Sequence, residues 1–194
     1  LFKNKIGIFM HYKTLNFHFF NTLCSKSTHR MLFNDHNVKS GNAAQTFFGL
    51  IADGLNHSKS SKVYVNSILP VNFSEQKKIF WNLKSEEENS ISYNYVPILN
   101  LPIFKNLLSS FYIFFQILFK KVLPNEKNVV ILDFLRFSIN FPAFLACKLR
   151  GIKTVVIVTD LPGEDVLKKT LKVKLRNLII FSLSFDFYIC VTKE

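Results

Sequence analysis

Two short polar segments of this chain carry residue types that bind phosphates and sugars. Gly41 and Asn42 come directly before an apolar repeat at helical spacing, so a flexible turn and a capping side chain precede a helix. Backbone amides at a helix start favour anions. Thr159 and Asp160 follow the apolar run 155–158. Because ligands of doubly wound sheets lie beyond the strand ends, the Asp160 carboxylate is placed to accept hydrogen bonds from sugar hydroxyls.

Each segment also has a purely structural explanation. Asn42 is an ordinary helix N-cap after a glycine turn, and the chain has neither a Gly-x-Gly-x-x-Gly nor a Walker pattern. Asp160 is equally suited to capping the next helix or to fixing the Pro-Gly turn that follows it. Both explanations stay open at the level of the sequence.

A third feature is an amphipathic pattern over residues 165–182. A stripe of leucines runs beside a cationic stripe formed by Lys168, Lys172 and Arg176. This pattern suits an anionic membrane surface, where each basic side chain contributes about 1 kcal/mol. A solvated helix on an α/β domain has the same pattern, so this alternative stays open too.

Histidines and cysteines form no metal-ligand or nucleophile pattern. His29 and His36 fall in an expected loop after the first strand, and no nearby cysteine or carboxylate has the spacing of a metal site, which favours solvated loop histidines. The three cysteines are far apart, which fits a reducing compartment. We therefore expect no metal cofactor and no Ser/His/Asp or Cys/His hydrolase.

The elements that must position these residues alternate along the chain, which predicts parallel βαβ units. Apolar or β-branched runs predict strands over 15–23, 62–69, 91–98, 128–134, 153–159 and 187–192. Helical spacing predicts helices over 42–55, 73–83, 101–123 and 138–150. The first helix is expected to bury one face, formed by Ala44, Phe47, Phe48, Ile51 and Leu55. The fold class expected is α/β, a doubly wound and mostly parallel Rossmann-like sheet.

Segment 101–123 has the composition most easily taken for a membrane span. Polar residues interrupt it, two lysines end it, and a span needs about 20 mostly apolar residues. Pro102 and Pro124 bracket it, as they would a helix of ordinary length. We expect a buried crossover helix here.

Length and charge limit the possible partners. The 194 residues suit one domain over 15–194, with 1–14 as an upstream segment. The net charge of +12 favours anionic partners, but the aromatic residues stand in apolar runs rather than among basic ones, so nucleic acid is not expected. The chain begins with Leu1 and stops after an expected strand, so we expect a fragment.

Three segments carry a family resemblance. Residues 41–45 (Gly-Asn-Ala-Ala-Gln), 158–162 (Val-Thr-Asp-Leu-Pro) and 185–194 resemble the N-terminal half of family 4 glycosyltransferases, which have the two-domain GT-B fold. The resemblance covers about 15–194. It implies that Gly41 and Asn42 lie near the donor phosphates and the acceptor. It also matches Asp160 to a residue near the reaction centre, with Thr159 where the family often has a histidine.

The resemblance further implies the reaction and its partners. A sugar would pass from a nucleotide-sugar donor to a glycan or lipid-linked acceptor with retention of configuration, in polysaccharide biosynthesis. The donor-binding domain is expected to be absent here, so this fragment alone would be inactive. A cytoplasmic location follows, with the inner membrane face as a peripheral site. The alternative is a non-enzymatic basic α/β module that binds a membrane surface or nucleic acid.

Overall fold

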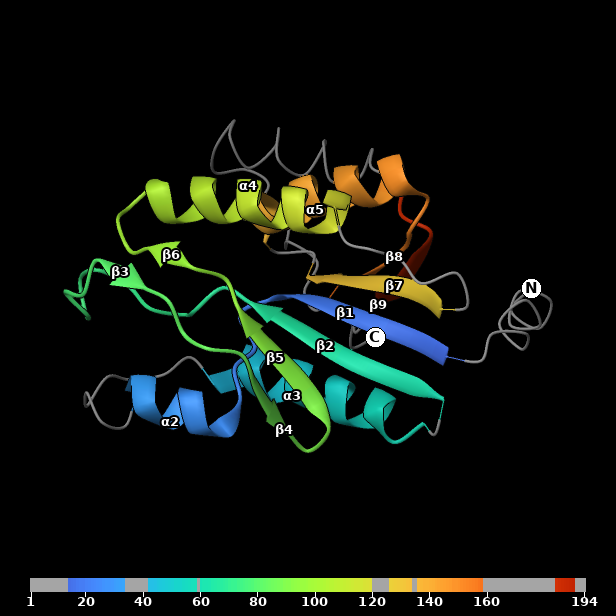
Figure 1. Ribbon diagram of the computed structural model, residues 1–194, viewed down its shortest axis with the longest axis horizontal. Helices are drawn as coiled ribbons and strands as arrows, with labels where there is room; N and C mark the ends of the chain where they lie inside the picture. Colours follow the sequence, from blue (N-terminus) through green and yellow to red (C-terminus); the bar gives the residue numbers. More distant parts are fainter. Residues whose placement is uncertain are drawn as a thin grey trace.

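The computed structural model describes residues 14–33, 42–58, 60–119, 126–133, 136–158 and 184–190. They form a seven-stranded sheet in the order β4-β5-β2-β1-β7-β8-β9, with a separate two-stranded sheet of β3 and β6 (Figure 1). The strands of the large sheet are β1 (Thr14–Asn21), β2 (Ser61–Ser67), β4 (Glu86–Glu88), β5 (Ile91–Tyr95), β7 (Glu126–Asp133), β8 (Lys153–Val158) and β9 (Phe187–Cys190). The small sheet pairs β3 (Phe80–Trp81) with β6 (Ile98–Leu99).

Helices cover both faces of the large sheet. Helices α2 and α3 lie on one face, and α4 and α5 lie together on the other (Figure 1). Their bounds are α2 (Lys26–Phe33), α3 (Asn42–Asn56), α4 (Phe104–Phe119) and α5 (Phe137–Arg150). Gly151 ends α5 in the left-handed region, at φ 64°, as expected of a glycine at a helix C-terminus. Helices therefore cover both faces of the sheet, as in a doubly wound α/β fold.

Strand β1 is at the centre because it is paired on both edges. It runs parallel to β2 and to β7, so that Phe19 lies between Val65 and Ile131. All three side chains are buried. A parallel strand covered on both faces favours such continuous apolar sequence.

The parallel strands follow the order 3-2-1-4-5-6 of a Rossmann-like fold. Only β4, at one edge, runs antiparallel to its neighbour. The prediction of a mostly parallel, doubly wound α/β sheet is confirmed, and the six predicted strands match β1, β2, β5, β7, β8 and β9. In this order the direction of winding reverses between β1 and β7, the point where ligands bind in such folds.

The predicted helix over 73–83 is wrong. These residues form a turn and an irregular stretch that leads into β3. Asn100 satisfies the backbone of this stretch, because its Nδ2 donates to the carbonyls of Gln76 and Lys78 at 3.1 and 3.2 Å. Trp81 is buried at the end of the stretch. Tertiary hydrogen bonds therefore replace those of a helix, which the apolar spacing alone did not reveal.

Two further expectations need correction near the first strand. The expected loop contains α2, so His29 lies on a helix, where burial lowers its pKa; His36 is outside the described residues. The acidic run Glu86–Glu88, for which no strand was predicted, is β4, and its first and last residues are half-buried.

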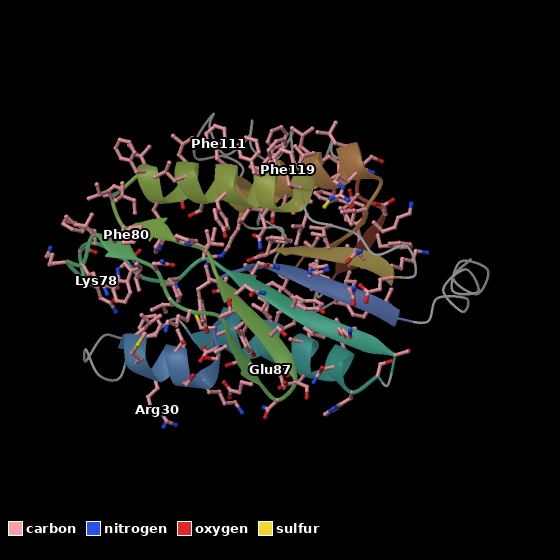
Figure 2. All side chains as sticks on the ribbon, viewed as in Figure 1. Arg30, Lys78, Phe80, Glu87, Phe111 and Phe119 are labelled. Carbon is pink, nitrogen blue, oxygen red and sulfur yellow. The ribbon has the colours of Figure 1, made fainter. Side chains whose placement is uncertain are left out.

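Helix α4 is less buried than predicted. Ile113 and Ile117 face the sheet, but Phe111 and Phe119 point away from it and are 55% and 73% exposed (Figure 2). Within the described part of the chain, no helix has the length and apolar character needed to cross a membrane. The helix is thus a crossover with one apolar face turned outward.

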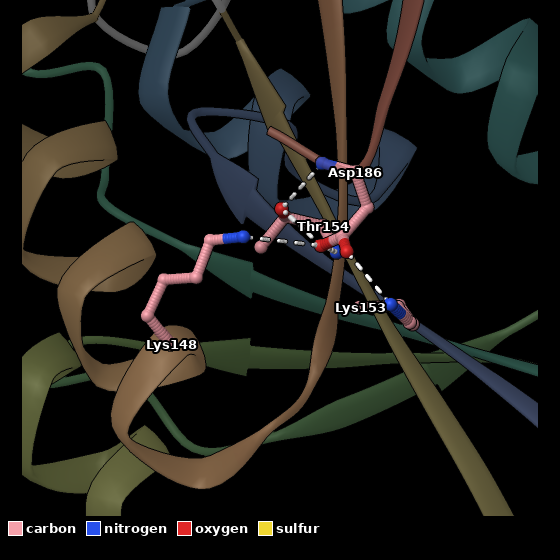
Figure 3. A network of polar contacts seen from close by, with 4 residues as sticks. All are labelled: Lys148, Lys153, Thr154 and Asp186. Atoms are coloured by element: carbon pink, nitrogen blue, oxygen red, sulfur yellow. Dashed lines mark hydrogen bonds and ion pairs between the residues drawn. The ribbon is translucent and has the colours of Figure 1, made fainter. Parts of the chain in front are cut away.

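Asp186 fixes the edge of the sheet opposite β4. Its carboxylate accepts hydrogen bonds from Lys153 Nζ at 2.8 Å and from the backbone N and Oγ1 of Thr154, both at 2.9 Å (Figure 3). Lys148 of α5 lies 3.8 Å away. Burial opposes ionisation of Asp186, but these bonds outweigh it and lower the pKa of the carboxyl. The network holds the entry to β9 against the start of β8.

The buried face of α3 differs slightly from the predicted one, and this difference can be tested. Phe48 and Ala52 are buried, whereas Phe47 is half-buried and packs at the margin of the core. We expect Phe48→Ala to lower the free energy of unfolding by about 3–5 kcal/mol. Phe47→Ala is the matched control and should cost less, as measured by denaturant unfolding. Equal losses would contradict this assignment of the face.

Candidate functional site

A cleft of about 590 Å³ opens at the carboxyl ends of the strands beside the point where winding reverses. Thr22 follows β1, Ile68 follows β2, and Arg136 follows β7. The remaining wall comes from residues 70–74 and from the turn that leads into α4. Its polar lining is Thr22, Asn72, Ser74, Asn100, Lys105, Asn106 and Arg136. Among the described residues that line it, two are basic and none is acidic.

Lys105 of α4 is the half-buried cation of this cleft. Its Nζ donates to the carbonyl oxygen of Val71. Burial, and then the charge of Arg136, lower the pKa of Lys105 from 10.5 to about 8, while Cys24 acts weakly in the opposite direction. The ammonium is thus held where it is poorly solvated and close to a second cation, which favours an anionic ligand.

The end of β7 leads to Arg136, which lines the same cleft at the carboxyl ends of the strands. It lies directly before α5, and its Nε is 3.5 Å from Oδ2 of the buried Asp133. No side-chain hydrogen bond caps α5 at Arg136. A helix start and an exposed guanidinium therefore adjoin the cleft, and both favour negative charge.

The start of α2, the helix that follows β1, cannot bind an anionic ligand in the same way, because two carboxylates of the protein already lie there. Backbone N of Lys26, at the start of α2, donates to Oε2 of Glu88 at 2.8 Å. Glu86 accepts hydrogen bonds from Ser27 Oγ and Thr28 Oγ1, at 2.9 and 2.7 Å, and also from Ser25 and Tyr95. Burial opposes ionisation of Glu86, but these hydrogen bonds prevail and lower the pKa of its carboxyl. In Rossmann folds the helix after the first strand often holds a phosphate.

Gln45, the last residue of the 41–45 motif, is bonded to the loop that follows β1. Backbone N of Cys24 donates to Gln45 Oε1 at 3.0 Å, and Gln45 Nε2 donates back to the Cys24 carbonyl. This pair of bonds fixes the first turn of α3 beside the loop that follows β1. Gln45 therefore has a positioning role that its sequence motif did not indicate.

The predicted site residues are only partly within the described residues. Asn42 is the first residue of α3, whereas an N-cap residue directly precedes its helix, and the Asn42 side chain is not described. Gly41, Thr159 and Asp160 lie outside the described residues, as do the basic residues Lys168, Lys172 and Arg176. Strand β8 ends at Val158, at the same edge as the carboxyl end of β1.

Sequence reasoning missed Lys105 and Arg136, although a signal for each was present. Arg136 comes shortly after the buried strand β7, whose last residue is Asp133, much as Asp160 comes shortly after the apolar run 155–158. Lys105 stands in the first turn of a helix, where a cation opposes the helix dipole. Such a conflict between local preference and structure often marks a functional position.

Known proteins provide no further guide to the site. Comparison of the chain found no matching family model, no matching curated protein and no matching solved structure. Within the described ranges, no group of three or more His, Cys, Asp or Glu is arranged to hold a metal ion. The chemistry of the cleft must therefore be argued from its own residues.

Lys105 makes a testable contribution to stability. Between pH 8 and 10.5 the unfolded chain binds more protons at this residue than the folded protein does. The loss of folding stability caused by burying the Lys105 ammonium therefore disappears as the pH rises. We expect Lys105→Met to raise the melting temperature by about 2–4 °C near pH 7. The difference from the wild type should shrink by pH 10, in thermal melts followed by circular dichroism. Tyr93 and Tyr95 titrate alike in both proteins, so they cancel in the comparison. A Lys105→Met protein that melts below the wild type at pH 7 would contradict the assigned cost of burial.

Proposed function

We propose that this domain is the acceptor-side half of a glycosyltransferase that uses a nucleotide-sugar donor. One observation supports the proposal: Gln45 and the carboxyl end of β8 both lie on the side of the sheet where its parallel strands end. Gln45, from the first motif, is bonded to the loop after β1, and β8, which leads into Thr159 and Asp160, ends on that side. A glycan or lipid-linked acceptor would enter the cleft beside it.

The cleft chemistry supports the same function. Amide and hydroxyl side chains, such as those of Asn72, Ser74 and Asn106, are the groups that recognise sugar hydroxyls. The cations Lys105 and Arg136 can donate hydrogen bonds to phosphate oxygens. The resemblance to family 4 enzymes adds Asp160 as a residue near the reaction centre and implies retention of configuration. It also implies that a second domain of the GT-B fold holds most of the donor nucleotide.

The test is transfer of a radiolabelled sugar from a panel of nucleotide-sugars to lipid-linked acceptors, with the protein as its complete gene encodes it. Asp160→Ala should lower the rate by about 100-fold, since proton transfer or charge stabilisation at the reacting centre is typically of this size. Its melting temperature should stay within about 1 °C of the wild type. Glu87→Ala, which removes an exposed carboxylate of β4 (Figure 2), is the control. Undiminished transfer by the Asp160→Ala protein would remove that residue from the site.

A non-enzymatic module that docks on an anionic membrane is the second candidate, and the outer face of α4 favours it. Leu107, Leu108, Phe111, Phe115 and Phe119 are each 45% exposed or more. The helix carries no acidic residue, and the chain has a net charge of +12. Aromatic side chains on a helix face, with basic charge nearby, are typical of proteins that bind the membrane interface.

Vesicle sedimentation distinguishes this candidate. A protein with Phe111→Ser and Phe119→Ser should bind vesicles containing anionic lipid at least tenfold more weakly than the wild type, because each change removes apolar area from the interface. Phe80→Ser is the matched control, since Phe80 is 57% exposed but lies on β3 and not on the outer face of α4 (Figure 2). Wild-type protein that stays in the supernatant would exclude the membrane module.

A further inference from the structure

We propose that the cleft between Lys105 and Arg136 binds the diphosphate group of an organic ligand. The inference deepens the proposed function by naming the chemical group recognised, and it rests on that function only for the organic part of the ligand. The anion site itself follows from the charges, the cleft and the neighbouring helix.

The first support is the imbalance of charge. Lys105 contributes a half-buried ammonium, and Arg136 an exposed guanidinium close enough to lower the pKa of that lysine. Asp133 lies beside Arg136 at 3.5 Å, but no described residue that lines the cleft is acidic. Two like charges that repel each other across a cleft become favourable neighbours when an anion lies between them.

The second support is the supply of hydrogen-bond donors at suitable places. Arginine presents a planar fork of N–H groups that matches phosphate oxygens, and lysine adds a compact point charge. The hydroxyls of Thr22 and Ser74 and the amides of Asn72 and Asn106 extend the polar wall. The cleft volume of about 590 Å³ leaves room beyond a phosphate group for an attached nucleoside or prenyl chain.

The third support is a process of elimination within the fold. At the start of α2, where a Rossmann fold often binds phosphate, Glu88 already accepts a hydrogen bond from the backbone N of Lys26, and Glu86 accepts one from the Thr28 hydroxyl. A ligand anion there would meet two carboxylates. The cleft lined by Lys105 and Arg136 lies toward α4 and α5, on the face of the sheet opposite α2. An anion near the carboxyl ends of the strands is therefore attracted to the cleft and not to the start of α2.

A strained residue lines the same cleft. Ile103 has a φ of 69°, which is unfavourable for a β-branched side chain, and its side chain is 80% exposed. The turn from 101 to 103 leads directly to Lys105, so its shape sets where the ammonium stands. Backbone strain of this kind persists where a fixed geometry is needed, as at ligand-binding turns.

Isothermal titration calorimetry on the full chain tests the site with three probes: pyrophosphate, uridine diphosphate and geranyl diphosphate. All three should bind the wild type. Higher affinity for uridine diphosphate than for pyrophosphate would identify a nucleotide ligand, and higher affinity for geranyl diphosphate would identify a prenyl-linked one. Lys105→Met and Arg136→Gln should each weaken binding at least tenfold, and Arg136→Lys, which keeps the charge but loses the planar fork, should weaken it less than Arg136→Gln does. Because Lys105→Met is expected to raise the melting temperature, its loss of binding cannot be ascribed to unfolding.

Matched controls remove exposed cations elsewhere. Lys62→Met acts at the amino end of β2, and Arg30→Gln acts on the outer side of α2 (Figure 2). Both proteins should bind pyrophosphate as the wild type does. Absence of binding by the wild type, or equal weakening by the controls and the cleft variants, would overturn the site. Diphosphate binding without any sugar transfer would leave the site intact and count against the glycosyltransferase alone.

Discussion

The parallel pairing of β1 on both of its edges is the constraint on which this structure depends. With β2 on one side and β7 on the other, β1 has no free edge. The chain must then wind outward in two directions from this strand, and its helices must cover both faces. The reversal of winding between β1 and β7 follows directly, and with it the place of the cleft.

Polar residues inside this central strand show how firmly its register is fixed. Asn16 Nδ2 donates to Glu126 Oε2 at 2.8 Å, and His18 Nε2 lies 2.8 Å from Asn128 Oδ1, so both side chains pair with β7. A shift of one residue would turn these groups into the apolar face and leave them without partners. Register therefore depends on polar contacts as well as on the core around Phe19.

Much of the fold could be predicted from the sequence, because it is encoded locally. The continuous apolar run 129–132 and the glycine at 151 are local signals, and they gave the central strands and the end of α5. The stretch 73–83 could not be assigned correctly, since Asn100, distant in sequence, satisfies its backbone. The candidate site was harder to predict. Thr159 and Asp160 were predicted from their place after a strand and lie outside the described residues, whereas Arg136, after β7, was missed, and Lys105 reaches the cleft only through the packing of α4.

The distribution of charge around β1 links the fold to its chemistry. On one side, Glu86 and Glu88 of an edge strand neutralise the start of α2, and four side-chain hydroxyls, including that of Tyr95, surround the Glu86 carboxylate. On the other side, Lys105 and Arg136 lie near each other with one buried carboxylate, Asp133, beside the arginine. A structure selected for stability alone would not keep a half-buried lysine in the first turn of a helix, against its dipole and next to an arginine. This loss of stability is explained if the cleft holds an anion, because the negative charge of the ligand then neutralises Lys105 and Arg136. Glu86 and Glu88 neutralise the start of α2 in the same way.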